Sequence, residues 1–124
     1  MATYNYQDLQ VWQKAMELVE EVYKVTEQLP KTELFALSSQ LKRAAVSIPS
    51  NIAEGQKRLN KAETIQFTGI ALGSIAETET QLILCQRLHG ADTYRALGLC
   101  TDVGKMSTAL IRSLKASAPL RSKL

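Results

Sequence analysis

Apolar residues recur at intervals of three and four along most of the chain, which is the spacing that places them on one face of an α-helix. The first such segment, residues 8–28, carries two apolar series. One series consists of Leu9, Trp12, Met16, Val19, Tyr23 and Thr26, and the other of Val11, Ala15, Leu18, Val22, Val25 and Leu29. Polar residues occupy the remaining arc, so we expect this helix to contact more than one neighbour and to keep one hydrated face.

The second helix is predicted over residues 32–55. Pro30 disfavours helix at Leu29, and Thr32 can cap the helix that follows. Glu33 would lie in its first turn, near the positive end of the helix dipole. Gly55 provides an end signal. The apolar stripe of this helix consists of Leu34, Leu37, Leu41, Ala44 and Ile48.

Pro49 interrupts the second helix. A proline inside a helix removes one backbone donor and clashes with the carbonyl group four residues earlier, here that of Ala45, so the sequence predicts a kink or a break. The side chains available to satisfy the freed backbone groups are those of Ser47, Ser50 and Asn51.

The third helix is predicted over residues 61–88. Asn60 and Glu63 have the spacing of a capping box before it, and Gly90 is an end signal after it. Gly69 and Gly73 lie four residues apart inside it and lower its helix propensity, so we expect a neighbouring backbone to pack closely there or the helix to bend.

The fourth helix is predicted over residues 92–116. Asp92 can cap it, and Pro119 is expected to stop it, which leaves residues 117–124 as a basic tail. Its core candidates are Leu97, Cys100, Val103, Leu110 and Leu114. Four helices with short connections favour up-down-up-down packing. The sequence therefore predicts an all-α protein, one domain over residues 1–124, that folds as an antiparallel four-helix bundle.

The start of the chain, Met-Ala-Thr-Tyr-Asn-Tyr, has no basic region followed by an apolar stretch, as a secretory signal would. The most apolar window, residues 67–76, is much shorter than the roughly 20 residues that a membrane span needs. We therefore expect a cytoplasmic protein with no membrane partner. Cys85 and Cys100 lack metal-ligand spacing and are predicted to be reduced thiols in the core.

The formal net charge of +3 conceals an uneven distribution of charge. In an up-down bundle the end of the second helix, the start of the third and the end of the fourth share one pole. The basic residues that converge there are Lys57, Arg58, Lys61, Arg112 and Lys115, followed by Arg121 and Lys123. Such a pole could attract phosphate by charge, but cations at helix ends also complement the helix dipole and are common on solvated surfaces.

Aromatic residues that could stack on bases are sparse, since only Tyr4, Tyr6 and Tyr94 look free, so sequence-specific base recognition is not predicted. A carboxylate-bridged metal site would need Glu-x-x-His pairs on two helices, and the single histidine, His89, has no such partner. We expect it to interact with a helix dipole.

No catalytic constellation is predicted either. Glu77 and Glu79 lie two residues apart on a helix and face different directions. No second base is available to activate a nucleophile, and no glycine-rich phosphate loop is present. The sequence therefore predicts no metal, no cofactor and no enzymatic activity.

Three motifs resemble those of a known family: YQDLQVWQKAM over residues 6–16, QLKRAAVSIPSNIAEG over residues 40–55 and IALGSIAE over residues 70–77. They resemble a bacterial four-helix-bundle family whose members are encoded in intervening sequences of large-subunit ribosomal RNA genes. The resemblance spans roughly residues 4–116.

The resemblance implies a small antiparallel bundle that assembles into a ring-like homopentamer without catalytic activity. A structurally similar family supplies the accessory subunit of retroelement reverse transcriptases, where a basic pentameric barrel binds the polymerase and nucleic acid. The family motif points to Lys42 and Arg43 as basic surface or interface residues. It also points to structural residues around the predicted break, which are Asn51, Glu54 and Gly55.

We therefore expect a homo-oligomeric, pentameric binding or scaffold protein whose partners are copies of itself and RNA or DNA. The two apolar series of the first helix suit an oligomer, because one can form the core and the other can contact a neighbour. The candidate nucleic-acid-binding residues are Lys42, Arg43, Lys57, Arg58, Lys61, Arg112 and Lys115.

Two alternatives remain at this point. The first is a protein-interaction subunit that delivers a polymerase or a ribosomal factor to nucleic acid, whose affinity would not depend on Lys57, Arg58 and Lys61. The second is an enzyme built on the bundle, which would need a bound metal or cofactor.

Overall fold

The structure is a computed structural model that describes the backbone of residues 5–122 and the side chains of residues 5–117. Residues 5–122 contain no β-strand, which confirms the predicted all-α four-helix class. The elements are the 3-10 helix η1 (Tyr6–Asp8), α1 (Gln10–Glu27), the 3-10 helix η2 (Lys31–Glu33), α2 (Leu37–Gln56), α3 (Lys61–His89) and α4 (Tyr94–Ser122).

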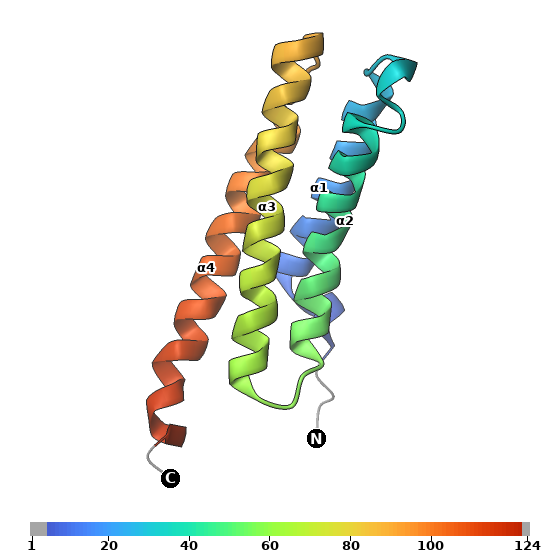
Figure 1. The fold of residues 1–124 in the computed structure, drawn as a ribbon. Helices are drawn as coiled ribbons and strands as arrows, with labels where there is room; N and C mark the ends of the chain where they lie inside the picture. Colours follow the sequence, from blue (N-terminus) through green and yellow to red (C-terminus); the bar gives the residue numbers. More distant parts are fainter. Residues whose placement is uncertain (1–4, 123–124) are drawn as a thin grey trace.

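The four helices lie side by side, and Figure 1 shows successive helices running in opposite directions. α1 and α3 each pack against both α2 and α4, so the helices follow one another around the bundle in chain order. The connection from α2 to α3 and the C-terminal part of α4 lie at the same end of the bundle as the start of α1 (Figure 1). That end is where the basic residues after α2 and late in α4 are found.

The two apolar series of α1 have different environments. The series from Val11 to Val25 is buried and forms part of the core. In the other series Met16 and Tyr23 keep 41% and 43% of their surface exposed, while Trp12 is half-buried against the core. α1 therefore contributes one series to the core and leaves part of the other at the surface.

The start of α2 differs from the prediction. Residues 31–33 form the separate turn η2, and α2 begins at Leu37 with no side-chain cap, so Thr32 does not cap it. Pro30, with φ −65°, starts the 3-10 turn directly. Leu34, which was placed in the apolar stripe, is exposed, as is Phe35. The stripe of α2 thus starts at Leu37, which is partly buried.

Pro49 lies inside α2, which continues from Leu37 to Gln56 without a break. The predicted break is therefore wrong, and a kink stays a prediction. Side chains on both sides of the proline donate to carbonyl oxygens: Ser47 Oγ to Ala44, Ser50 Oγ to Val46 at 2.8 Å, and Asn51 Nδ2 to Ser47 at 2.7 Å. The Ala45 carbonyl, which loses its donor at Pro49, is not one of these three acceptors, so the bonds satisfy neighbouring carbonyl groups and not the freed one.

The ends of α3 are capped as the sequence predicted. The Oδ1 atom of Asn60 accepts a hydrogen bond from the Glu63 backbone N–H at 2.9 Å. At the other end Gly90 has φ 66°, a left-handed conformation, and its N–H donates to the Gln86 carbonyl. Asp92 Oδ1 then accepts a hydrogen bond from the Tyr94 N–H, at the start of α4.

Close packing at glycine occurs elsewhere than predicted. Gly69 and Gly73 are exposed, and a Cβ atom added at either would meet no atom within 4 Å, so no backbone in the described part of the chain packs closely against them. Gly55 is the tightly packed glycine, because a Cβ atom there would lie 3.0 Å from Phe67 Cβ and 3.2 Å from the Thr64 carbonyl oxygen. The end of α2 and the start of α3 thus meet at Gly55.

α4 is longer than predicted, since it continues past Pro119 to Ser122. Proline removes one backbone donor and disfavours helix without excluding it. Residues 123–124 of the expected tail lie outside the described residues. Cys85 and Cys100 are free and buried, as predicted. Among the described helices, none has the length and apolar character required to cross a membrane.

Candidate nucleic-acid interface

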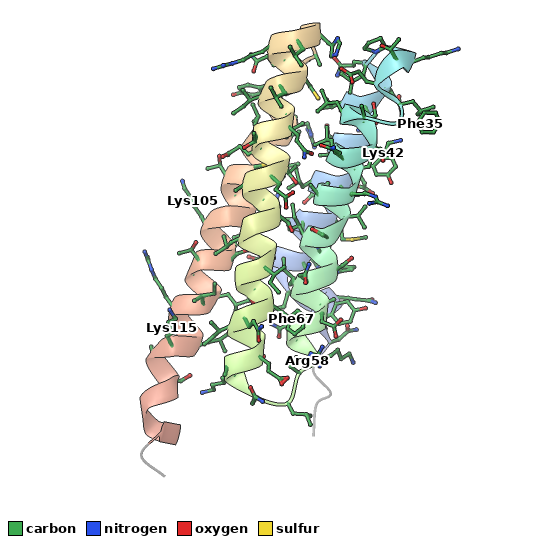
Figure 2. The ribbon with its side chains drawn as sticks, in the orientation of Figure 1. Phe35, Lys42, Arg58, Phe67, Lys105 and Lys115 are labelled. Carbon is green, nitrogen blue, oxygen red and sulfur yellow. The ribbon has the colours of Figure 1, made fainter. Side chains whose placement is uncertain are left out.

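Four of the predicted basic residues come together at one end of the bundle. Lys57 and Arg58 follow α2, Lys61 begins α3, and the Lys61 ammonium donates a hydrogen bond to Ser117 Oγ late in α4. Figure 2 shows Arg58 and Lys115 in this same part of the molecule. We call the surface formed by Lys57, Arg58, Lys61 and Lys115 the basic end.

The cations of the basic end also contact the protein itself. The Arg58 guanidinium lies 4.6 Å from the centroid of the Phe67 ring, and its Nη2 atom lies 3.2 Å from Glu54 Oε2. The Lys57 ammonium lies 5.9 Å from the centroid of the Tyr6 ring. Arg58 and Glu54 are both well exposed, so their ion pair is screened by water and leaves guanidinium N–H groups accessible. The basic end thus holds four cations, with the Glu54 carboxylate beside Arg58 and that of Glu63 in the first turn of α3.

Lys42 and Arg43 lie elsewhere. Lys42 is near the other end of α2, as Figure 2 shows, and its ammonium lies 4.8 Å from the centroid of the Tyr23 ring. A shallow groove of about 410 Å³ on this face is lined by Tyr23, Lys42, Arg43, Val46, Ser47, Ser50 and Asn51. The sequence motif that contains these two cations therefore belongs to the α1–α2 face and not to the basic end.

Arg112 is exposed on α4 and lines a groove between α3 and α4 of about 560 Å³. The α3–α4 groove is lined by Leu72, Ile75, Ala76, Glu79, Cys100, Thr101, Gly104, Lys105, Thr108, Ala109 and Arg112. The sequence interpretation missed this groove, although the small residues Ala76, Gly104 and Ala109 on facing sides of the two helices are a signal that could have indicated it. Arg121 and Lys123 are not among the residues whose side chains the structure describes.

Stacking of bases has little support at the basic end. Tyr6, which was expected to be free, packs edge-on against Trp12 with 5.5 Å between ring centroids. Phe67 is half-buried beneath Arg58. Tyr94 is 88% exposed, as expected, but it begins α4 at the opposite end from Lys115. Tyr4 lies outside the described residues. Charge, rather than aromatic stacking, is therefore the chemistry that the basic end offers.

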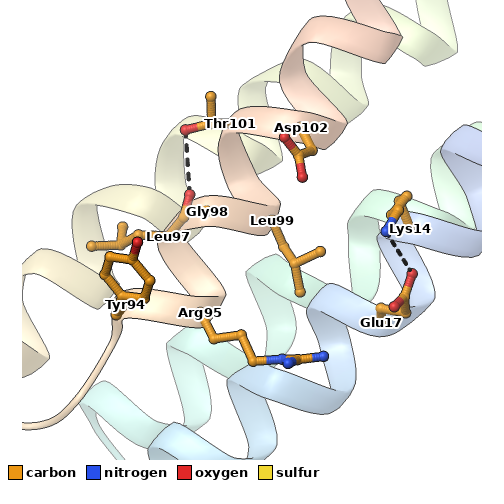
Figure 3. A pocket seen from close by; sticks show the side chains of 9 residues that line it. All are labelled: Lys14, Glu17, Tyr94, Arg95, Leu97, Gly98, Leu99, Thr101 and Asp102. Carbon is orange, nitrogen blue, oxygen red and sulfur yellow. Dashed lines mark hydrogen bonds and ion pairs between the residues drawn. The ribbon is translucent and has the colours of Figure 1, made fainter.

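A third groove, shown in Figure 3, lies between α1 and α4 and measures about 490 Å³. Arg95 and Leu99 extend from α4 toward α1, and Lys14 pairs with Glu17 at 3.4 Å on the α1 side. Arg95 Nε also lies 3.4 Å from Glu21 Oε2. Because its cations already face carboxylates, this groove offers no excess of positive charge to phosphate.

His89 and Glu33 contact each other and are not part of a group of metal ligands. The Nε2 atom of His89 lies 2.7 Å from Glu33 Oε2, so the histidine has a carboxylate partner that the sequence did not indicate. The hydrogen bond from His89 holds the pKa of the Glu33 carboxyl below its ordinary value. Burial raises the pKa of the Cys100 thiol to about 12 and also raises that of Cys85. Within residues 5–117, no three His, Cys, Asp or Glu side chains are grouped to hold a metal ion.

The chain has relatives among known families and solved structures. A family model described as 23S rRNA-intervening sequence protein matches residues 7–112. A crystal structure from Bacteroides thetaiotaomicron, of a protein with unknown function from the S23 ribosomal protein family, is 26% identical in sequence. The similarity covers 82% of this chain and 97% of that chain, with a TM-score of 0.75. None of the curated proteins matches this chain. Neither of the two descriptions names an enzymatic activity.

Proposed function

The chain belongs to the 23S rRNA-intervening sequence protein family, and from this premise we propose that it is a homopentameric, non-enzymatic binding or scaffold protein of the cytoplasm whose basic end binds RNA or DNA. The observation that carries the proposal is that Lys57 and Arg58 in the α2–α3 connection, Lys61 of α3 and Lys115 of α4 lie at one end of the bundle. No cofactor or membrane takes part in this function.

The exposed series of α1 supports self-association. Met16 and Tyr23 are large apolar side chains that the core of this chain leaves uncovered, and Val46 on α2 is similarly exposed. An exposed group of large apolar residues on a small protein marks an interaction surface. A second copy that covered it would remove apolar area from water.

Assembly would strengthen a weak basic surface. Each subunit contributes only a few cations, so a single basic end would bind phosphate weakly at physiological salt. In a ring the basic ends lie on one rim, and a nucleic acid that contacts several of them binds with a higher effective affinity. The affinity should then fall steeply as salt concentration rises, because counterions are released on binding.

Binding of fluorescein-labelled single-stranded RNA and DNA, measured by anisotropy across a salt series, tests the nucleic-acid part of the proposal. The variant Lys57→Gln/Lys115→Gln removes two exposed cations of the basic end that form no ion pair among the described residues. The slope of log K against log salt should lose about 0.7 for each cation removed from every contacting subunit.

The matched control is Lys31→Gln/Arg87→Gln, which removes the same charge from exposed positions near the opposite end of the bundle. The control should keep the wild-type slope. Equal losses in the two variants would mean that net charge, and not the basic end, attracts the nucleic acid. Absence of binding at low salt would overturn this part of the proposal.

A second candidate function is a protein-interaction subunit that brings a polymerase or a ribosomal factor to nucleic acid. The engagement of Arg58 with Glu54 and Phe67, and of Lys57 with Tyr6, favours it, because these contacts compete with phosphate. The relative from the S23 ribosomal protein family is compatible with a ribosomal factor as partner. Under this function, affinity for the complex would be the same in wild type and Lys57→Gln/Lys115→Gln.

A further inference from the structure

The outward side of α1 has the pattern of a helix that docks into a groove. Trp12, Met16, Val19 and Tyr23 follow one another at intervals of four, three and four residues, and Met16 and Tyr23 are substantially exposed. Grooves that bind helices recognise anchors at this spacing. Val46 of α2 is 41% exposed and extends the apolar surface beside Tyr23. We call these five residues the α1 stripe.

The α3–α4 groove has the complementary shape. Its floor contains Leu72, Ile75 and Cys100, of which Ile75 and Cys100 belong to the core, while small residues such as Gly104 line its α4 side. A Cβ atom added at Gly104 would meet nothing within 4 Å, so none of the described residues fills the space above it. A helix carrying large side chains could therefore enter the groove without displacing the chain's own residues.

The two surfaces face away from each other. The helices follow chain order around the bundle, so the α1–α2 face lies opposite the α3–α4 face. Figure 2 accordingly shows Lys42 and Lys105 on opposite sides of the bundle. When two copies are placed side by side with these faces in contact, α1 of one copy lies beside α4 of the next, and α2 lies beside α3.

Two pairs of opposite charges can meet at the edges of the two surfaces in that arrangement, and two further cations, Arg43 on the α1–α2 face and Arg112 in the groove, lie beside them. Glu20 is exposed on α1 four residues from Met16, and Lys105 is exposed on α4 at the groove. On the other pair of helices, Lys42 of α2 would face Glu79 of α3. No ion pair among the described side chains uses any of these four residues. Opposite charges at both edges would fix the register of the two copies.

The heights of Lys42 and Glu79 along the bundle are also compatible. With a rise of about 1.5 Å per residue, Lys42 lies about 21 Å from the end of α2 at Gln56, and Glu79 lies about 27 Å from the start of α3 at Lys61. Both of those helix ends are at the basic end of the bundle. The difference is within the combined reach of a lysine and a glutamate side chain.

We propose that copies of this chain join head to tail, with the α1 stripe of one copy seated in the α3–α4 groove of the next. The inference rests on the proposed function, because it identifies the two surfaces through which the proposed homo-oligomer would assemble. A contact between two different faces of the same chain closes into a ring when the rotation between copies allows it. Pairing of the α1 stripe with itself would leave the α3–α4 groove and its apolar floor uncovered.

A complementation experiment by native mass spectrometry tests the head-to-tail contact. Val46→Glu places a charge in the α1 stripe, and Gly104→Met fills the groove at a position where the chain leaves space. Each variant alone should associate at least about tenfold more weakly than wild type, because an interface anchor or its pocket is lost. A mixture of the two should form a one-to-one heterodimer, since each variant retains the surface that the other lacks.

Two controls separate the interface from general effects on α3 and α4. Gly98→Met adds the same side chain at another open glycine of α4, which lines the α1–α4 groove instead. Ile70→Glu adds a charge at an exposed apolar residue of α3 that lines none of the three grooves. Both controls should keep the wild-type subunit number, and circular dichroism should show that all four variants remain folded.

The outcomes distinguish this inference from the proposed function. A wild-type protein that stays monomeric at micromolar concentration would remove the oligomer itself and the inference with it. A wild-type oligomer that Gly104→Met leaves intact, or one in which only Val46→Glu dissociates and mixing restores nothing, would keep the oligomer but overturn the head-to-tail contact. Loss of RNA binding without any change in subunit number would likewise place nucleic acid, not a second copy, on the altered surface.

Discussion

The Nε2 atom of His89 at the end of α3 lies 2.7 Å from Glu33 Oε2 in η2 and joins the two connections at one end of the bundle. A second contact between the same connections is made by Gln28, whose side chain donates to the Asp92 carbonyl and accepts from the Asp92 N–H. The Glu33–His89 contact ties η2 to the end of α3. The helix prediction from residue 32 fails at Ala36, where the backbone has φ −119° and ψ −103° and is not helical, so η2 does not continue into α2.

The pairing of Glu33 with His89 should make stability depend on pH. The hydrogen bond from His89 lowers the pKa of Glu33 from 4.5, so the stabilising effect is complete above that value and is lost as pH falls through the lower pKa of the folded state. We expect wild type to have a higher melting temperature than Glu33→Gln at pH 5 to 6, and the difference to shrink at lower pH. A difference that stayed constant down to about pH 2 would contradict this account.

The two sides of α1 should respond differently to truncation. Leu18 is fully buried, so Leu18→Ala should lower the free energy of unfolding by about 2–5 kcal/mol. Met16 is 41% exposed, and Met16→Ala should cost less than about 1.5 kcal/mol in the monomer because few of its contacts are lost. Urea denaturation of both variants, at a concentration where the protein is monomeric, measures the two losses. Equal losses would mean that both series belong to one core.

Local signals in the sequence predicted the helix ends better than the contacts between distant segments. Asn60 caps α3 and Gly90 ends it, because each acts on backbone groups within a few residues. The contact of Glu33 with His89 and the stacking of Arg58 on Phe67 depend on how the helices pack, and no spacing in the chain encodes them. The same limit explains why the α1 pattern indicated two contact faces but could not say which one the core would use.

In the candidate site, too, the sequence predicted what depends on chain order and missed what depends on helix packing. The gathering of Lys57, Arg58 and Lys61 follows from a short connection between two adjacent helices, so chain order was enough to predict it. The position of Lys42 beside Tyr23 depends on the rotation of α2 about its own axis, which a linear motif does not give. For that reason the cations predicted from the sequence to form one binding site lie on separate surfaces, among them the basic end and the α1–α2 face.

Glycine substitutions should have opposite effects at two positions. Gly55→Ala should lower the free energy of unfolding by about 1–3 kcal/mol, because the new Cβ atom would be forced against Phe67 and the Thr64 carbonyl. Gly73→Ala should raise it by about 0.5–1 kcal/mol, since Gly73 has open space around it and alanine favours helix. Thermal and urea unfolding measure both changes. A stabilising Gly55→Ala would show that α2 and α3 can separate there without cost.

Ser107 offers a test of an uncompensated polar group in the core. Its side chain is fully buried in α4, and its Oγ atom has no hydrogen-bond partner among the residues that the structure describes. A buried hydroxyl without a partner costs free energy, whereas the methyl group of alanine is not penalised there. Ser107→Ala should therefore raise the free energy of unfolding by about 1 kcal/mol. Ser74→Ala, at a buried serine on α3 whose hydroxyl accepts a hydrogen bond from Ser47 Oγ, is the matched comparison and should not be stabilising. If Ser107→Ala destabilised the protein as much as or more than Ser74→Ala, the Ser107 hydroxyl would have a hydrogen-bond partner in solution, such as a bound water.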